Sequence, residues 1–339
     1  MKKLLSIVLA LTLVLALAAC GAKTEAPAET GAPVESTPEA GGEKYLIGIS
    51  QYGEHPSLDN CRKGFLEGLA EAGLVEGTDF TVDYQNAGFD DNIAIQIGQS
   101  FSAENVSLMC AIATPSATAC YAAAEDKDIP VIFTAITDPA LAHLDSGNVT
   151  GTSDKLPVEA QLDLIHKLQP EAKTIGIIYT TSEPNSVSAI AEYEAKAPDY
   201  GFTIDAIGVT AQSEVTQAAD TLIAHGVDCF SNLTDNNVVG VLAAILEKTN
   251  EAGIPVYGSE VEQVKIGCVA AAGIDYVKLG RQTGVMAAKV LRGEANCKDI
   301  PFETISEYGV YVNSEACTTM KLTLPEDVAA EAIEAKTAE

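Results

Sequence analysis

The chain has 339 residues, of which 47% are hydrophobic and 20% charged. This balance is typical of a globular protein and excludes a chain that is disordered throughout, and the length predicts about two domains. Against 20 Lys and Arg stand 48 Asp and Glu, a formal net charge of −28, which argues against non-specific nucleic-acid binding because phosphate contacts need a basic surface.

Residues 1–19 have the form of a secretory signal peptide. Lys2 and Lys3 precede an apolar run over 4–19, which is shorter than the roughly 20 residues of a membrane span. The run ends in Leu-Ala-Ala followed at once by Cys20, as in the bacterial lipobox; the alternative is a short buried helix that ends in a cysteine. By resemblance to bacterial lipoproteins, Cys20 would carry acyl chains such as palmitate and become the mature N-terminus, and two chains suffice for stable anchoring.

The segment 20–43 is expected to be a disordered tether that follows the lipidated cysteine. It is rich in Pro, Glu, Ala, Thr and Gly, and Val34 is its only large apolar residue. Such a composition cannot bury a core. The folded part therefore begins near residue 44.

The seven cysteines after Cys20 show no metal-binding pattern. None is spaced C-x-x-C and no histidine lies at a ligand spacing from them. Cys110, Cys229 and Cys268 fall in apolar runs, where a cysteine is usually a small core residue. We expect neither a metal nor a cofactor; at least one thiol should be free because seven is odd, and a single disulfide is left open.

From residue 44 onward, short apolar runs alternate with amphipathic stretches. Most runs are continuously hydrophobic, which indicates parallel strands covered on both faces; the predicted strands are 45–50, 80–85, 108–113, 131–136, 174–179, 202–209, 229–233, 256–259, 268–272 and 310–313. Between them, apolar residues recur at intervals of three and four, which predicts helices over 58–72, 117–127, 158–168, 186–199, 213–225, 238–252 and 276–291. This alternation predicts a doubly wound α/β fold.

Ligands of open α/β sheets bind beyond the carboxyl ends of the strands, where this chain carries hydroxyls, amides and carboxylates but no Lys or Arg. Thr114-Pro115-Ser116 has a good N-cap residue followed by a favoured first helical residue. The free N–H groups of such a helix start favour an anion. Because the chain has no Gly-rich cradle and no Walker lysine, a carboxylate fits better than a phosphate, although capping alone explains the same residues.

Carboxylates in other turns could pair with an ammonium group. Glu183, Asp235, Glu260 and Asp275 all follow predicted strands, although an N-cap or a solvated loop is the commoner role of such residues. An anion-receiving helix start in one half and spare carboxylates in the other together suit a zwitterion.

Signatures of catalysis are missing from the sequence. It has no G-x-S-x-G elbow, no H-E-x-x-H and no G-x-G-x-x-G after the first strand. The four histidines are scattered; His166 and His225 fall in amphipathic helices, whereas His55 lies in the first loop and could line a cleft. We therefore expect a protein that is not an enzyme.

Several segments spread along the chain carry a resemblance to a known family. Among them are Tyr45-Leu-Ile-Gly-Ile-Ser50, His55-Pro-Ser-Leu-Asp59, Ala113-Thr-Pro-Ser-Ala117, Ser182-Glu-Pro-Asn-Ser186 and Leu279-Gly-Arg-Gln-Thr283. As a set, and over nearly all of 44–326, they resemble substrate-binding lipoproteins of ABC transporters, whose best-known members take up tryptophan, phenylalanine or tyrosine. The resemblance implies the type I periplasmic-binding-protein fold, in which two Rossmann-like lobes with parallel sheets are joined by a three-segment hinge and close around a ligand.

This resemblance also implies a division of the chain into lobes. Lobe one would be 44–153 plus 277–306, and lobe two would be 154–276 plus 307–330. The three crossovers would fall near 152–153, 273–276 and 306–308.

Roles in lobe one follow from location within that fold. Thr114, Ser116 and the N–H groups after Pro115 would hold an α-carboxylate. Thr137 would add a hydroxyl, and Tyr52 could lie along an apolar side chain of the ligand.

Lobe two would supply the residues that close over the ligand, namely Ser182, Glu183, Asn185 and Ser186. For the ammonium group the first expectation is Asp235, beside Asn236, and the second is Asp275.

The implied function is that of a lipid-anchored solute-binding component of an ABC importer. On the outer face of the bacterial cytoplasmic membrane it would capture a small zwitterion, with an aromatic amino acid favoured, and deliver it to the permease and its ATPase. The anchor would be its only contact with the membrane. A sugar or nucleoside receptor of the same fold is the alternative, a secreted α/β hydrolase is a weaker one, and an aromatic content of 6% leaves an aromatic ligand open rather than compelled.

Overall fold

The computed structural model describes residues 44–305 and 307–337. The predicted signal peptide, the lipid site at Cys20 and the tether over 20–43 lie outside these residues. Among the helices that are described, none is long and apolar enough to cross a membrane.

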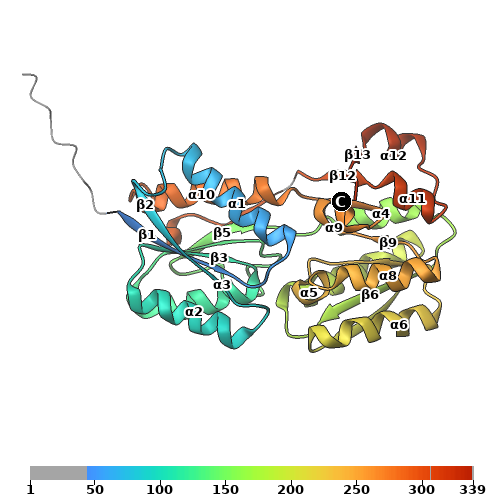
Figure 1. Cartoon of the computed structure of the whole chain (residues 1–339), viewed down its shortest axis with the longest axis horizontal. Helices are drawn as coiled ribbons and strands as arrows, with labels where there is room; N and C mark the ends of the chain where they lie inside the picture. The colour runs from blue at the N-terminus through green and yellow to red at the C-terminus, as the bar shows by residue number, and fades with distance from the viewer. Residues whose placement is uncertain (1–43, 306, 338–339) are drawn as a thin grey trace, which may run out of the picture. The chain divides into compact units, whose positions relative to one another are not determined.

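The first five strands of the chain and β11 from near its end build a parallel sheet in the order β11-β5-β4-β3-β1-β2. Its strands are β1 (Tyr45–Gln51), β2 (Phe80–Asn86), β3 (Leu108–Ile112), β4 (Val131–Thr134), β5 (Val149–Ser153) and β11 (Glu303–Thr304). One face carries α1 (Pro56–Glu71) and α10 (Tyr276–Leu291), and the other carries α2 (Asp91–Glu104) and α3 (Thr114–Ala124) (Figure 1).

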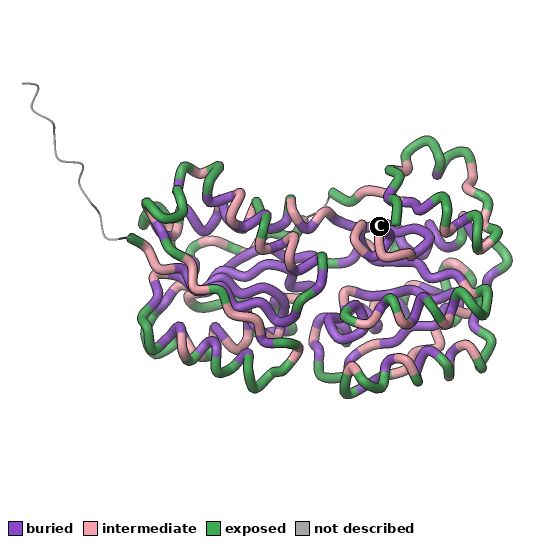
Figure 2. Tube along the Cα trace, in the orientation of Figure 1, coloured by how far each residue is buried: buried purple, intermediate pink, exposed green. Residues whose placement is uncertain are grey.

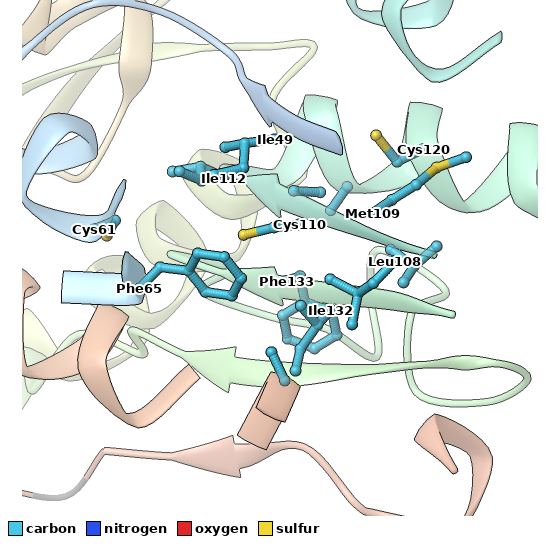
Figure 3. Packing of buried hydrophobic residues seen from close by; sticks show 14 of the residues in the cluster. Ile49, Cys61, Phe65, Leu108, Met109, Cys110, Ile112, Cys120, Ile132 and Phe133 are labelled. Carbon is cyan, nitrogen blue, oxygen red and sulfur yellow. The ribbon is translucent and has the colours of Figure 1, made fainter. Parts of the chain in front are cut away.

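The centre of this sheet is fully buried, which explains why its strands are hydrophobic on both faces. Ile49, Met109 and Phe133 have no exposed surface and interlock with side chains from the covering helices (Figure 3). Cysteine serves here as a small core residue: the described thiols are all free and buried, at Cys61, Cys110, Cys120, Cys229, Cys268, Cys297 and Cys317.

A second parallel sheet has four strands in the order β7-β6-β8-β9. They are β6 (Thr174–Thr180), β7 (Thr203–Val209), β8 (Cys229–Ser231) and β9 (Val256–Tyr257). Ile175 and Ile177 of β6 pack with α4 (Val158–Leu168) and α5 (Pro184–Lys196), whereas Ile178 packs with α6 (Val215–His225) and α8 (Leu242–Ala252). Helices thus cover both faces, and buried strands lie between helices with exposed outer surfaces (Figure 2).

A third, small sheet departs from the parallel arrangement predicted. β10 (Ala270–Gly273) pairs antiparallel with β12 (Gly309–Val312), and β12 pairs parallel with β13 (Ile333–Glu334). The remaining helices are short: α7 (Asn236–Val239), α9 (Val261–Ile266), α11 (Ser314–Thr319) and α12 (Glu326–Glu331).

The chain passes three times between the six-stranded sheet and the other two. It leaves after β5, returns between β10 and α10, and leaves again between β11 and β12. The boundaries given above for two lobes stay a prediction.

Predicted and observed elements differ where the sequence pattern was weak. β5 reads VTGTS and has no continuous apolar run, and α2 mixes buried Ile97 with exposed Ile93 and Ile95; neither was predicted. The helix predicted over 238–252 is divided into α7 and α8, since the chain leaves the helix at Gly240 and Val241.

Helices α1 and α10 pack backbone against backbone, which requires glycine at the contact. A Cβ atom at Gly64 would lie 2.1 Å from the carbonyl oxygen of Val277, and one at Gly284 would lie 2.1 Å from that of Phe65. Gly68 and Gly280 stand in the same relation to the facing helix. The contact therefore fixes the distance between the two helices.

Replacing Gly284 by alanine tests this constraint. In an open helix the change would stabilise the protein by about 1 kcal/mol, but here we expect the free energy of unfolding to fall by roughly 1–3 kcal/mol because the helices are forced apart. Urea unfolding measures the change, with Lys289→Ala on the exposed side of α10 as a control that shifts it by less than about 0.5 kcal/mol. A stabilised Gly284→Ala protein would contradict the packing.

Candidate ligand-binding site

A nearly closed cavity of about 10 Å³ lies where loops from the six-stranded sheet meet loops from the four-stranded sheet. Its lining mixes apolar and polar side chains: His55, Ser57, Leu58, Ala135, Asp154, Thr234, Asn236, Val239, Gln263 and Tyr276. This volume holds at most about one water molecule, so an amino acid could enter only if the loops around the cavity moved apart. Of the residues predicted to contact a ligand, Asn236 lines the cavity, and Thr137 bonds to two residues that do.

Asp154 supplies the carboxylate of this cavity. It is 2% exposed, and its Oδ1 and Oδ2 accept hydrogen bonds from Thr137 Oγ1 at 2.9 Å and Tyr276 Oη at 2.6 Å. Burial raises the pKa of Asp154, and these two bonds oppose the shift. A carboxylate has about four acceptor positions, so Asp154 keeps capacity for a further donor. Sequence reasoning missed it because it follows β5, which was itself missed.

Asp235, in contrast, forms all its hydrogen bonds with other parts of the fold. Its oxygens accept hydrogen bonds from the backbone N–H and the hydroxyl of Thr180, from Ser186 Oγ and from the N–H of Val238, at 2.6–3.0 Å. It caps α7 and ties it to β6 and α5. The expectation that Asp235 holds an ammonium group stays a prediction, but its acceptor positions are already used.

Glu183 connects the β6–α5 turn to the first residues of α7. Its carboxylate accepts hydrogen bonds from the backbone and side-chain amides of Asn236 and Asn237, and from Asn185 Nδ2. Burial and the neighbouring charge of Asp235 raise the pKa of Glu183. Most of the residues predicted for lobe two are therefore brought together, but their hydrogen bonds connect two segments of the fold to each other.

The start of α3 is capped by a different residue than predicted, which leaves the Thr114 hydroxyl unused. Its N-cap is Ala113, at φ 78° and ψ 154°, and not Thr114. The Thr114 hydroxyl is buried and has no hydrogen-bond partner in the part of the chain that is described, whereas Ser116 Oγ accepts from Ser50 Oγ at 3.2 Å and Pro115 is half-buried. Ala135, at the end of β4, also has a positive φ of 59°, and such strain is concentrated at functional sites.

Three further predicted residues also lie outside the cavity lining. Tyr52 donates from its hydroxyl to Asp91 Oδ1 at 2.8 Å. Asp275 caps α10 by accepting from the N–H groups of Val277 and Lys278, and Ser182 is exposed.

Hydrogen bonds join the six-stranded part to the four-stranded part around the cavity. Ser57 Oγ donates to Glu260 Oε1 at 3.0 Å, Thr137 Oγ1 lies 3.3 Å from Thr234 Oγ1, and Ser188 Oγ donates to Asp138 Oδ2 at 2.8 Å. Burial raises the pKa of Glu260 to about 7. Residues 44–305 and 307–337 contain no group of acidic, histidine or cysteine side chains able to hold a metal ion.

Comparison with known proteins gives a consistent result. A family model described as ABC transporter substrate binding protein matches residues 46–336. A tyrosine-binding protein of Clostridioides difficile is 39% identical over 282 residues, which are 81% of each chain.

Two solved structures share this fold. One, an ABC domain from Streptococcus pneumoniae in complex with L-Trp, is 33% identical, has a TM-score of 0.82 and covers 86% of this chain and 99% of its own. The other, a ligand-free, open substrate-binding protein with adhesive properties from Clostridium difficile, is 35% identical, has a TM-score of 0.63 and covers 87% and 100%. At nearly equal identity, the conformation described here is thus more similar to the complex than to the open form.

The role of Asp235 can be tested through stability. Asp235→Ala leaves buried N–H and hydroxyl donors unpaired, so we expect the free energy of unfolding to fall by about 3 kcal/mol or more. Asp275→Ala removes a half-buried cap and should cost about 1 kcal/mol. Urea unfolding compares the two, and equal losses would contradict a special role for Asp235.

The buried Glu260 predicts a pH dependence of stability. Its pKa of about 7 in the folded protein lies above the value of about 4.3 in an unfolded chain, so the folded state binds more protons between these values. The stability it contributes is present below about pH 4 and is lost as the pH rises through 7, a total of about 4 kcal/mol. Unfolding of the native protein and of Glu260→Gln, measured from pH 4 to 8, should give curves that diverge by this amount; parallel curves would contradict the prediction.

Proposed function

Since the chain belongs to the family of ABC transporter substrate-binding proteins, we propose that it binds an aromatic amino acid in the cavity around Asp154 and delivers it to an ABC permease and its ATPase. The main support for this proposal is Asp154, a buried carboxylate that can accept further hydrogen bonds and lines a small, partly apolar cavity. The similarity to a tyrosine-binding protein and to a protein in complex with L-Trp supports the same ligand class.

The ammonium group of the ligand would bind Asp154 in place of Asp235 or Asp275. An ammonium carries three donors, and the acceptor positions of Asp154 that Thr137 and Tyr276 leave open suit one of them. The positive charge would offset the burial that raises the pKa of this carboxyl.

The carboxylate of the ligand would be held at the start of α3, by Thr114, Ser116 and the N–H groups after Pro115. The Thr114 hydroxyl supports this assignment because it is buried and is not spent on capping. The apolar part of the ligand would lie against Leu58 and Val239.

Ligand capture would involve closure of two lobes, 44–153 plus 277–306 and 154–276 plus 307–330, about the three crossovers. The hydrogen bonds Ser57–Glu260 and Ser188–Asp138 would then form on closure, since each joins one lobe to the other. The protein would carry out no chemistry itself. Cleavage before Cys20 and lipidation of this residue would hold it on the outer face of the membrane.

Replacing Asp154 by asparagine tests the site. The change keeps the shape of the side chain but removes its charge, so we expect the affinity for tyrosine or tryptophan to fall by at least about 30-fold. Calorimetric titration of the full-length protein measures this, with Asp275→Asn as a control that leaves affinity unchanged. The corresponding ligands without an amino group should bind native and Asp154→Asn proteins with similar affinity; an equal loss for both kinds of ligand would contradict the ammonium contact.

A further inference from the structure

We propose that His55 determines which aromatic amino acid is bound, because its imidazole forms a hydrogen bond with a polar atom on the ligand's ring. The residue would favour tyrosine and tryptophan and reject phenylalanine. This inference rests on the proposed function, since it takes an aromatic amino acid as the ligand of the cavity.

The first observation is that His55 is buried without a partner. It lines the cavity, is 8% exposed, and neither of its ring nitrogens accepts or donates a hydrogen bond among the described residues. An unpaired buried polar group costs roughly 1–3 kcal/mol. Asn236, which lines the same cavity, lies near enough to oppose the fall in the pKa of His55, but its geometry gives no hydrogen bond to the ring. Buried polar groups are usually paired, so the two ring nitrogens are open to a ligand.

The imidazole is also held in a fixed orientation. Its ring stacks on Phe89, with centroids 6.3 Å apart and an interplanar angle of 7°. Phe89 lies over Gly53, where a Cβ atom would come within 2.0 Å of the phenyl ring, and its backbone N–H donates to the carbonyl oxygen of Tyr52 at 2.8 Å. A ring positioned in this way loses little freedom when it binds.

Asp154 lies near the part of α1 that contains Cys61, whereas His55 comes directly before the helix. Cys61 Sγ lies 3.9 Å from Thr134 Oγ1, and Thr134 accepts from Thr152 Oγ1 at 3.2 Å, two residues before Asp154. The part of α1 near Cys61 is therefore the part that approaches the end of β5.

His55 comes directly before α1, whose first residue Pro56 precedes Cys61 by five residues, or roughly 7.5 Å along the helix axis. The apolar side chain of Leu58 lies between them in sequence and lines the same cavity. The carboxylate of Asp154, the apolar side chain of Leu58 and the imidazole of His55 line one cavity, where they would face the ammonium group, the aromatic ring and the ring substituent of tyrosine.

The chemistry of the imidazole selects the group it binds. Burial lowers the pKa of His55 to about 4, so the ring is neutral near pH 7 and offers one donor and one acceptor nitrogen. A phenol O–H or an indole N–H can donate to the acceptor nitrogen. Phenylalanine would desolvate the imidazole and leave it unpaired, and sites built for a hydrogen bond reject such analogues strongly.

Calorimetric titration of the full-length protein with tyrosine, tryptophan and phenylalanine tests the assignment. The native protein should bind tyrosine or tryptophan at least about 100-fold more tightly than phenylalanine. His55→Phe keeps the stack on Phe89 and removes the polar atoms, so the favoured ligand should lose roughly 10- to 100-fold in affinity while phenylalanine binds as well as before or better. His166→Phe, at an exposed position of α4, should change none of the affinities.

Two results would overturn the proposal: native protein that binds phenylalanine as tightly as the others, or His55→Phe that weakens all three ligands equally. If His55→Phe fails to fold, the native affinity ratio and His55→Gln, which keeps a donor and an acceptor and should retain part of the preference, decide the matter. Native protein that binds none of the three ligands but does bind a sugar or nucleoside would overturn the proposed function instead.

Discussion

The cavity depends on the backbone contact between α1 and α10. These helices come from opposite ends of the folded chain, and their glycines allow an approach that no side chain would permit. The first residues of both helices line the same cavity, Ser57 and Leu58 on α1 and Tyr276 on α10. A change in the distance between the helices would therefore move two walls of the site at once, although the contact itself lies outside the cavity.

Three buried carboxylates near this site show how the same chemical group acquires different roles. Asp235 and Glu183 accept so many hydrogen bonds from neighbouring loops that they act as internal connectors. Asp154 accepts two, from side chains that hold it at the edge of the cavity. The number of internal donors, and not the type of residue, separates a structural carboxylate from one available to a ligand.

The elements that could be predicted from the sequence are those whose burial leaves a recognisable pattern of apolar residues. Continuous apolar runs identified the central strands and with them the α/β fold, because burial on both faces leaves a pattern in the sequence. β5 lacks this pattern: the Thr152 hydroxyl pairs with that of Thr283, and the Ser153 hydroxyl donates to the backbone carbonyl of Thr137. Without the strand, Asp154 could not be recognised. Asp235 stood out in sequence as an acid after a strand, but its partners Thr180 and Ser186 lie about 50 residues away and only the folded chain brings them together. His55 was noted as a cleft residue, whereas its lack of a partner is a property of the structure.

The buried cysteines have a consequence for how the protein can be observed. Burial raises the pKa of their thiols, that of Cys120 to about 12, and thiolates are the reactive form. In the native state these thiols are therefore unreactive toward oxidants and thiol reagents. Cys61, Cys110 and Cys120 lie in the core around the six-stranded sheet, and Cys229, Cys268 and Cys317 lie in the cores around the other two sheets. Each of these six thiols becomes reactive only when its own core opens. The rate at which each cysteine reacts with a thiol reagent would therefore report how often its core opens, without any added label.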